Sequence, residues 1–158
     1  MPTTLVDLES VIEDYSGLSR KVLEYSRLMK QMVDLAKQPG FSEASWAPVA
    51  AMVDTANFER VGNFKEVMRW DEYVAFLTGW AQGSGWECSF RRVTESGNVV
   101  LLELEERSQF GAHSSVVNSV SVYEFNAAGL IEHLDIYLQM PMPDPAMLSN
   151  YDGIQITE

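Results

Sequence analysis

The sequence contains a single cysteine, Cys88, among 158 residues. One thiol excludes an intramolecular disulfide framework and a zinc site built from several cysteines. Cys88 lies in an alternating run of polar and apolar residues, 86–90, where a small buried apolar side chain is the expected role. We therefore assign it no catalytic function.

Positive charge is also scarce. Eleven Lys and Arg face 23 Asp and Glu, the formal net charge is -12, and no Lys or Arg follows Arg107. Nucleic acid and anionic membranes require a cationic patch, so we expect neither as a partner; a solvated acidic surface explains the charge. No apolar run approaches the roughly 20 residues of a membrane span, and residues 1–4 lack a secretion-signal pattern, so a cytoplasmic location is expected.

The chain has only two histidines, His113 and His133, twenty residues apart. This spacing provides no pair of metal ligands on one helical turn. The sequence also lacks a glycine-rich phosphate loop and a nucleophile elbow. We expect no metal and no cofactor.

Apolar residues recur at helical spacing in the first part of the chain. The pattern predicts helices over residues 5–15, 18–36 and 70–81. A short helix is also expected to begin at Ser45, whose hydroxyl can cap it, with Pro48 in its first turn. These helices precede the predicted sheet.

From residue 85 the period changes to two, which is typical of strands. The pattern predicts long strands over residues 86–94, 98–107, 116–125 and 130–139, and a short strand over 55–61. Turns at 95–98 and 126–129 make neighbouring strands antiparallel. We therefore expect one α+β domain over residues 1–140, with helices on the concave face of a curved sheet and a cavity between them. The Pro-rich residues 141–158 are expected to form an extended tail.

Three segments resemble a known family: residues 52–58 (MVDTANF), 70–76 (WDEYVAF) and 122–135 (VYEFNAAGLIEHLD). With the order of elements, they are similar to the SnoaL-like branch of the nuclear transport factor 2 superfamily, from about Ser45 to Met140. The resemblance implies a conical, cystatin-like α+β barrel with a deep apolar pocket, often in a homodimer. Polyketide cyclases, ketosteroid isomerase, scytalone dehydratase, limonene epoxide hydrolase and non-catalytic proteins share this fold, so fold alone does not decide the chemistry.

The His-x-Asp pattern of SnoaL-like cyclases matches His133 and Asp135. The resemblance implies that Asp135 acts as a general acid/base, with a pKa raised by an apolar cavity, and that His133 is its partner. The two carboxyl positions of ketosteroid isomerase fall on Arg60 and Ser121, so isomerisation by its usual residues is not expected. No motif supplies the polar set of the epoxide hydrolase, and the dehydratase's histidines and tyrosines are only loosely imitated.

The face of the last strand decides whether this site exists. His133, Asp135 and Tyr137 alternate with Leu134, Ile136 and Leu138, so one row faces the cavity and the other faces away. The polar row is either the active site or a solvated stripe on the convex face. A one-residue change of register in the turn at 126–129 exchanges the two rows.

Other candidate ligand-binding residues come from elements expected around the cavity. Ser119, Ser121 and Tyr123 share one face of the preceding strand, and Arg60 lies on the short strand. Phe58, Trp46 and Trp80 are candidate walls, although each also fits a simple core. Glu103 and Glu105 are interpreted as polar residues on an exposed sheet face.

Two classes of function follow, and a third stays open. The first is a cofactor-free acid/base enzyme acting on a small hydrophobic carbonyl or cyclic compound, with Tyr137 and Ser121 orienting the substrate. The second is a non-catalytic module that binds a small hydrophobic ligand in the same cavity. The third is a homodimerisation domain that uses Leu134, Ile136 and Leu138 as its contact.

Overall fold

The computed structural model describes residues 4–141. Its helices and strands are, in chain order, β1 (Val6–Asp7), α1 (Gly17–Leu35), α2 (Ala47–Ala50), β2 (Glu59–Val61), β3 (Val67–Arg69), α3 (Trp70–Gly83), β4 (Ser84–Ser96), β5 (Val99–Phe110), β6 (His113–Phe125) and β7 (Ile131–Gln139). The predicted C-terminal tail lies outside the described residues from 142 onward. No helix in residues 4–141 is both long and apolar enough to cross a membrane.

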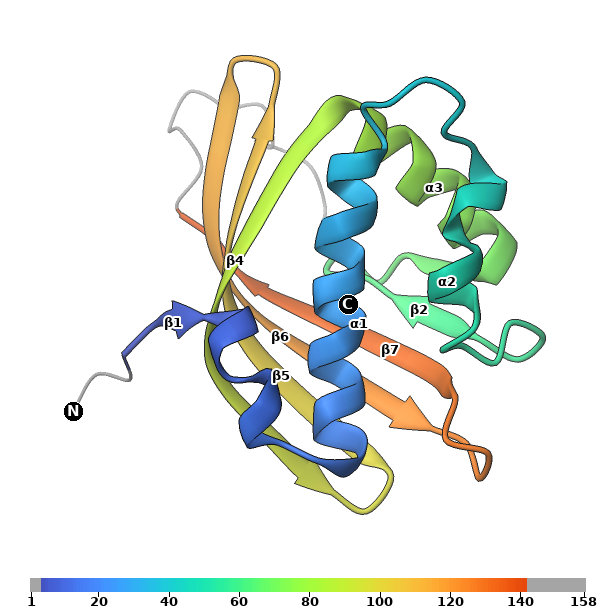
Figure 1. The fold of residues 1–158 in the computed structure, drawn as a ribbon, viewed down its shortest axis with the longest axis vertical. Helices are drawn as coiled ribbons and strands as arrows, with labels where there is room; N and C mark the ends of the chain where they lie inside the picture. The colour runs from blue at the N-terminus through green and yellow to red at the C-terminus, as the bar shows by residue number, and fades with distance from the viewer. Residues whose placement is uncertain (1–3, 142–158) are drawn as a thin grey trace, which may run out of the picture.

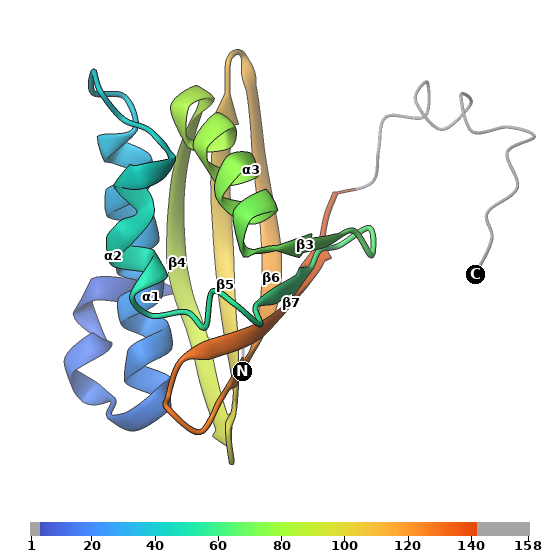
Figure 2. The same ribbon diagram turned by 90° about the vertical axis from the view of Figure 1, so that its right-hand side faces the viewer.

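The sheet contains seven strands in the order β1-β4-β5-β6-β7-β2-β3. Strands β4 to β7 form a long antiparallel meander, while β2 pairs parallel to β7. Figures 1 and 2 show the sheet curving around α1 and α3, which lie on its concave side. The predicted α+β fold is confirmed. Helices on one side of a curved sheet place the inward-facing rows of β4 to β7 opposite the helices.

Hydrogen bonds at both ends attach α1 to the sheet layer. The Glu95 carboxylate, at the end of β4, accepts hydrogen bonds from the backbone N–H and hydroxyl of Ser19 at 2.6 and 2.8 Å. It thus satisfies a backbone donor in the first turn of α1, where negative charge is also favourable. Beyond the other end, the Lys37 ammonium donates to the carbonyl oxygens of Val33, Ala81 and Ser84.

Three local predictions are wrong. Residues 5–15 form β1 and two short 3₁₀ turns, because apolar residues at this spacing over two turns suit either helix type. Ser42, rather than Ser45, precedes the next helical turn, and the two serines bond reciprocally in a capping box. Strand β6 begins at His113, three residues before the predicted start at residue 116.

The β6–β7 connection is organised by Asn126. Its side-chain oxygen accepts hydrogen bonds from the backbone N–H groups of Ala128 and Leu130, both at 3.0 Å. Its side-chain nitrogen donates to Asp54 at 3.1 Å, and Gly129 adopts a φ of 77°, which favours glycine. The turn is therefore fixed both within itself and against the segment that follows α2.

A β-bulge follows this turn. Phe125 pairs with Ile131, whereas the preceding residue of β6, Glu124, pairs with His133, so Glu132 is one extra residue in β7. Ile131 is buried, and strict alternation from it would point His133 inward. The extra residue reverses the alternation, so the next inward residue is Leu134, which is also buried.

Replacing Asn126 by alanine should lower the free energy of unfolding by about 1–3 kcal/mol, because two backbone donors lose their acceptor. Urea unfolding followed by circular dichroism measures the change. Asn57→Ala is the matched control, since Asn57 also donates to Asp54 but is exposed and outside the turn. Equal losses in the two variants would show that the turn is not the stabilising element.

Candidate functional site

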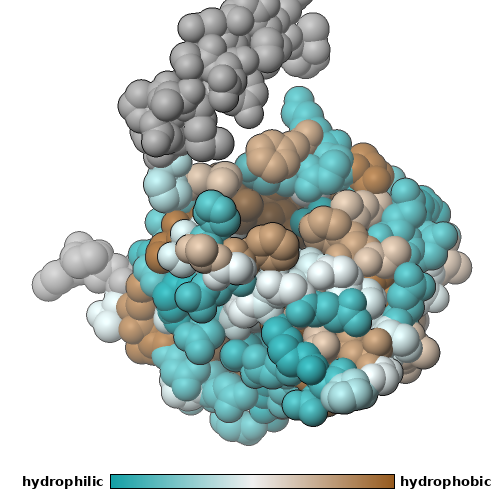
Figure 3. All heavy atoms as spheres, turned by 90° about the horizontal axis from the view of Figure 1, so that it is seen from above, coloured by the Kyte–Doolittle hydropathy of each residue, from teal (hydrophilic) through white to brown (hydrophobic). Residues whose placement is uncertain are grey.

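A cavity of about 320 Å³ lies between the helices and the concave face of the sheet. Strands β4 to β7 supply its floor, and α1, α3 and β2 supply the remaining walls. The polar groups lining it are Tyr25, Ser26, Arg60, Tyr73, Glu106, Ser108, Ser115, Ser121 and Tyr123. Figure 3 shows a hollow with hydrophobic walls in the surface seen from above the view of Figure 1.

The last strand presents its apolar row to the cavity. Leu134, Ile136 and Leu138 line it, so the prediction that Asp135 and His133 lie in the cavity is wrong. The bulge at Glu132 is the physical reason, because it shifts the alternation by one residue.

The polar row instead forms a cluster on the outer face of the sheet. His133 Nε2 lies 3.0 Å from Asp135 Oδ1, and His133 Nδ1 lies 3.6 Å from Glu59 Oε1. Tyr137, on the same row, is 60% exposed. These three predicted site residues are therefore together in space, but away from the cavity.

The cavity does bring together other predicted residues. Arg60, Trp80, Ser121 and Tyr123 line it. The remaining candidates lie in the buried core outside the lining: Ser119, Phe58 and Trp46.

Arg60 projects from β2 with only 11% of its side chain exposed. Its guanidinium carbon lies 5.2 Å from the centre of the Tyr73 ring and 5.8 Å from that of Phe76. Such contacts attract a cation to an aromatic face and hold its orientation. Its ion pair with Glu66 is long, at 3.4 Å.

Three buried tyrosines surround the inner part of the cavity. Burial is the main cause that raises the pKa of Tyr25, Tyr73 and Tyr123 above the ordinary value. The nearby Arg60 charge opposes the shift at Tyr25 and Tyr73 without cancelling it. The three phenols therefore stay protonated at neutral pH and can donate hydrogen bonds.

Glu106 is a carboxylate in the cavity lining that was not among the predicted site residues. It lies on β5, and its Oε1 accepts a hydrogen bond from the indole N–H of Trp86 at 2.8 Å. The predicted pair, Glu103 and Glu105, faces outward and bonds to Arg92 and Arg107. Glu106 lies on the same face of β5 as the buried residues Val100, Leu102 and Leu104. An acid at a position where the alternation predicts an inward-facing side chain was the sequence signal for this residue.

No known family profile and no curated protein sequence matches this chain. Solved structures do. An NTF2-like protein of unknown function from Cytophaga hutchinsonii has a TM-score of 0.56 at 15% identity, over 85% of this chain and 96% of its own. An LEH-like epoxide hydrolase from M. tuberculosis has a TM-score of 0.53 at 16% identity, over 71% of this chain and 84% of its own. A protein from Jannaschia sp. CCS1, assigned as a SnoaL-like polyketide cyclase, has a TM-score of 0.54 at 12% identity, over 87% of this chain and 94% of its own.

The fold is NTF2-like. The resemblance drawn from short motifs is confirmed at the level of the fold. Identities of 12–16% say nothing further about chemistry, because this fold hosts unrelated activities.

Within this NTF2-like fold, the homodimer stays a prediction whose contact residues must change. Leu134, Ile136 and Leu138 face the cavity, so they are unavailable for a contact through the sheet. Apolar residues on the outer face include Leu101, Val120, Val122 and Tyr137, which neighbour one another through the strand register.

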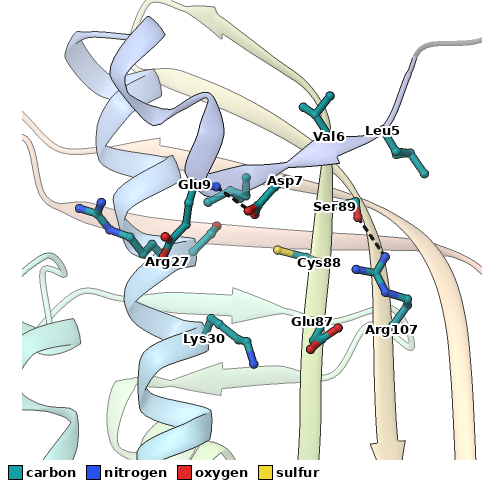
Figure 4. Close-up of a pocket in the computed structure, with 12 residues that line it drawn as sticks. Leu5, Val6, Asp7, Glu9, Arg27, Lys30, Glu87, Cys88, Ser89 and Arg107 are labelled. Atoms are coloured by element: carbon teal, nitrogen blue, oxygen red, sulfur yellow. Dashed lines mark hydrogen bonds between the residues drawn. The ribbon is translucent and has the colours of Figure 1, made fainter.

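A second hollow, of about 430 Å³, lies between β1, α1 and β4 (Figure 4). Its lining mixes acids and bases, and Arg107 already contacts Ser89 and Glu105 at 3.0 and 2.9 Å. Burial raises the pKa of the Cys88 thiol there to about 12, so it is protonated at neutral pH. The Cys88 thiol is therefore not a nucleophile in this hollow.

Metal ligands do not gather in the part of the chain that the structure describes. Across residues 4–141, no three His, Cys, Asp or Glu side chains lie close enough to hold a metal ion. The charged groups in the cavity lining are Glu106 and Arg60, which lie there beside the hydroxyl groups.

The buried tyrosines should make the protein less stable in alkali. Their folded-state pKa lies above the unfolded value of 10.0, so their contribution is complete below that pH and is lost as the pH rises. Between pH 10.0 and its folded-state pKa, each buried tyrosine should lower the free energy of unfolding by about 1.4 kcal/mol per pH unit. Tyr25→Phe should reduce this slope in urea unfolding. An unchanged slope in Tyr25→Phe would contradict the assignment.

Proposed function

We propose that the protein binds a small, largely apolar carbonyl compound in this cavity and moves a proton on it, with Glu106 as the general acid/base. The observation that carries the proposal is the placing of one carboxylate and several neutral hydroxyl donors in the same apolar-walled cavity of about 320 Å³. This volume suits a small molecule.

Proton abstraction next to a carbonyl needs a base and a donor for the negative charge that develops on oxygen. One oxygen of Glu106 is held by the Trp86 indole, which orients the carboxylate toward the cavity. The Tyr73 hydroxyl lies within the electrostatic influence of both Glu106 and Arg60, so it is suited to donate to the carbonyl oxygen. Ser121, across the floor on β6, is a second donor.

The similar structures support this class of chemistry only by analogy. One is described as an LEH-like epoxide hydrolase and another is assigned as a SnoaL-like polyketide cyclase. Neither name transfers a reaction to this chain, whose cavity has its own charged groups. A non-catalytic binding module is the second candidate, favoured by the position of the His-x-Asp pattern outside the cavity.

Hydrogen–deuterium exchange tests proton transfer without knowledge of the product. Small cyclic ketones in D₂O, followed by ¹H NMR, should exchange their α-protons faster with the protein than without it. Glu106→Gln should reduce the enzymatic rate by about 100-fold or more, because general base catalysis contributes that much. Glu105→Gln is the matched control, since it removes the adjacent carboxylate from the outer face.

Two outcomes would contradict the proposal. Binding of these ketones by thermal shift without any exchange would identify a binding module. Loss of exchange in Asp135→Asn, with Glu106→Gln fully active, would return the catalytic role to the residue that the sequence pattern indicates.

A further inference from the structure

Arg60 carries a charge that the protein itself only partly neutralises. Removing a guanidinium from water is costly unless it is paired and hydrogen-bonded. In residues 4–141 its ion pair is with Glu66, through a single Nη1 contact of 3.4 Å. The buried Nε of Arg60 has no hydrogen-bond partner there.

Glu66 is a weak counter-ion for this site. Its side chain is 38% exposed, and its other carboxylate oxygen accepts the backbone N–H of Phe64 at 2.9 Å. The backbone N–H groups of Glu66 and Phe64 lower the pKa of Glu66 against the opposing effect of burial, and the Arg60 charge adds to them. Glu66 is therefore stabilised largely by its own turn.

The surroundings of Arg60 suit an anion. The guanidinium is oriented over the rings of Tyr73 and Phe76, so little freedom is lost when a ligand binds. A guanidinium with a free Nε can donate two parallel hydrogen bonds to a carboxylate. The phenol of Tyr25, which feels the Arg60 charge, adds a neutral donor nearby.

The negative charge of the cavity, Glu106, lies at a different position along the sheet from Arg60. Arg60 is level with Leu134 and, through it, with Tyr123, whereas Glu106 pairs with Val117. Val117 and Tyr123 are six positions apart on β6, while the Tyr73 phenol is close enough to both charges to feel each of them. The cavity is thus positive toward one end and negative toward the other, with apolar walls between.

We propose that the ligand is a small apolar carboxylic acid, bound with its carboxylate on Arg60 and its apolar body along Leu134 and Ile136. This inference rests on the proposed function of the cavity and adds the class of ligand. A molecule bound in this direction presents the end remote from its carboxylate to Glu106.

Pairs of acids and their primary amides test the inference directly, because they differ in charge and little in shape. Suitable probes are 2-naphthylacetic, indole-3-acetic, 4-phenylbutyric and 3-cyclohexylpropionic acids, each with its amide. Calorimetric titration of the whole protein at neutral pH should show at least one acid binding about 10- to 100-fold more tightly than its amide, as expected for a charge-assisted hydrogen bond. Equal affinity, or no binding by any acid, overturns the inference.

Variants test which residue causes the preference for an acid over its amide. Arg60→Gln should lower the affinity for the acid to about that for its amide, and Arg60→Lys should retain part of the preference for the acid. Glu66→Gln should strengthen acid binding, because it removes the competing carboxylate. Arg69→Gln is the matched control, since it removes an exposed arginine from the neighbouring strand. A preference that survives Arg60→Gln, in a variant with wild-type circular dichroism, places the carboxylate elsewhere and overturns the assignment.

The inference and the proposed function fail separately. Ketone exchange that depends on Glu106, without any preference for acids, leaves the proton-transfer proposal standing and rejects the carboxylic acid. An acid preference that depends on Arg60, without any exchange, supports the ligand class in a protein that only binds.

Discussion

The cavity depends on one constraint, the extra residue at Glu132 in β7. Without it, the alternation that begins at the buried Ile131 would bring His133 and Asp135 to the helices and expel the leucines to solvent. That exchange would place two polar side chains among the apolar ones of α1 and α3, where each needs a partner. The bulge therefore makes the cavity wall apolar and leaves its charges to β2 and β5.

The bulge is held from both sides of the strand. On one side, Asn126 closes the turn from β6. On the other, the segment after α2 forms an isolated bridge between Val53 and Ile131, with hydrogen bonds of 3.0 and 2.9 Å on either side of it. A shift of β7 by one residue would break both sets of contacts. The register of β7 is therefore fixed at its first residue, ahead of the residues that pair with β2.

Sequence reasoning predicted the strands well and the site poorly, for a physical reason. Period-two alternation gives the two faces of each strand, and for β5 and β6 it gives the correct rows, including Tyr123 and Ser121. It cannot reveal a bulge, because an extra residue leaves the local composition unchanged while reversing every later position. Glu106 was within reach, since it continues the row of Val100, Leu102 and Leu104.

Arg60 and Glu106 share a cavity without forming an ion pair with each other in the described part of the chain, which places a cost on folding. Attachments far from the cavity oppose that cost: the Glu95 carboxylate at the start of α1, and Lys37 with its carbonyl partners beyond the end of that helix. These contacts fix the position of α1, which supplies Tyr25, Ser26 and Met29 to the cavity wall. A molecule that provides partners for the two charges, and that binds only the folded state, raises the stability of that state.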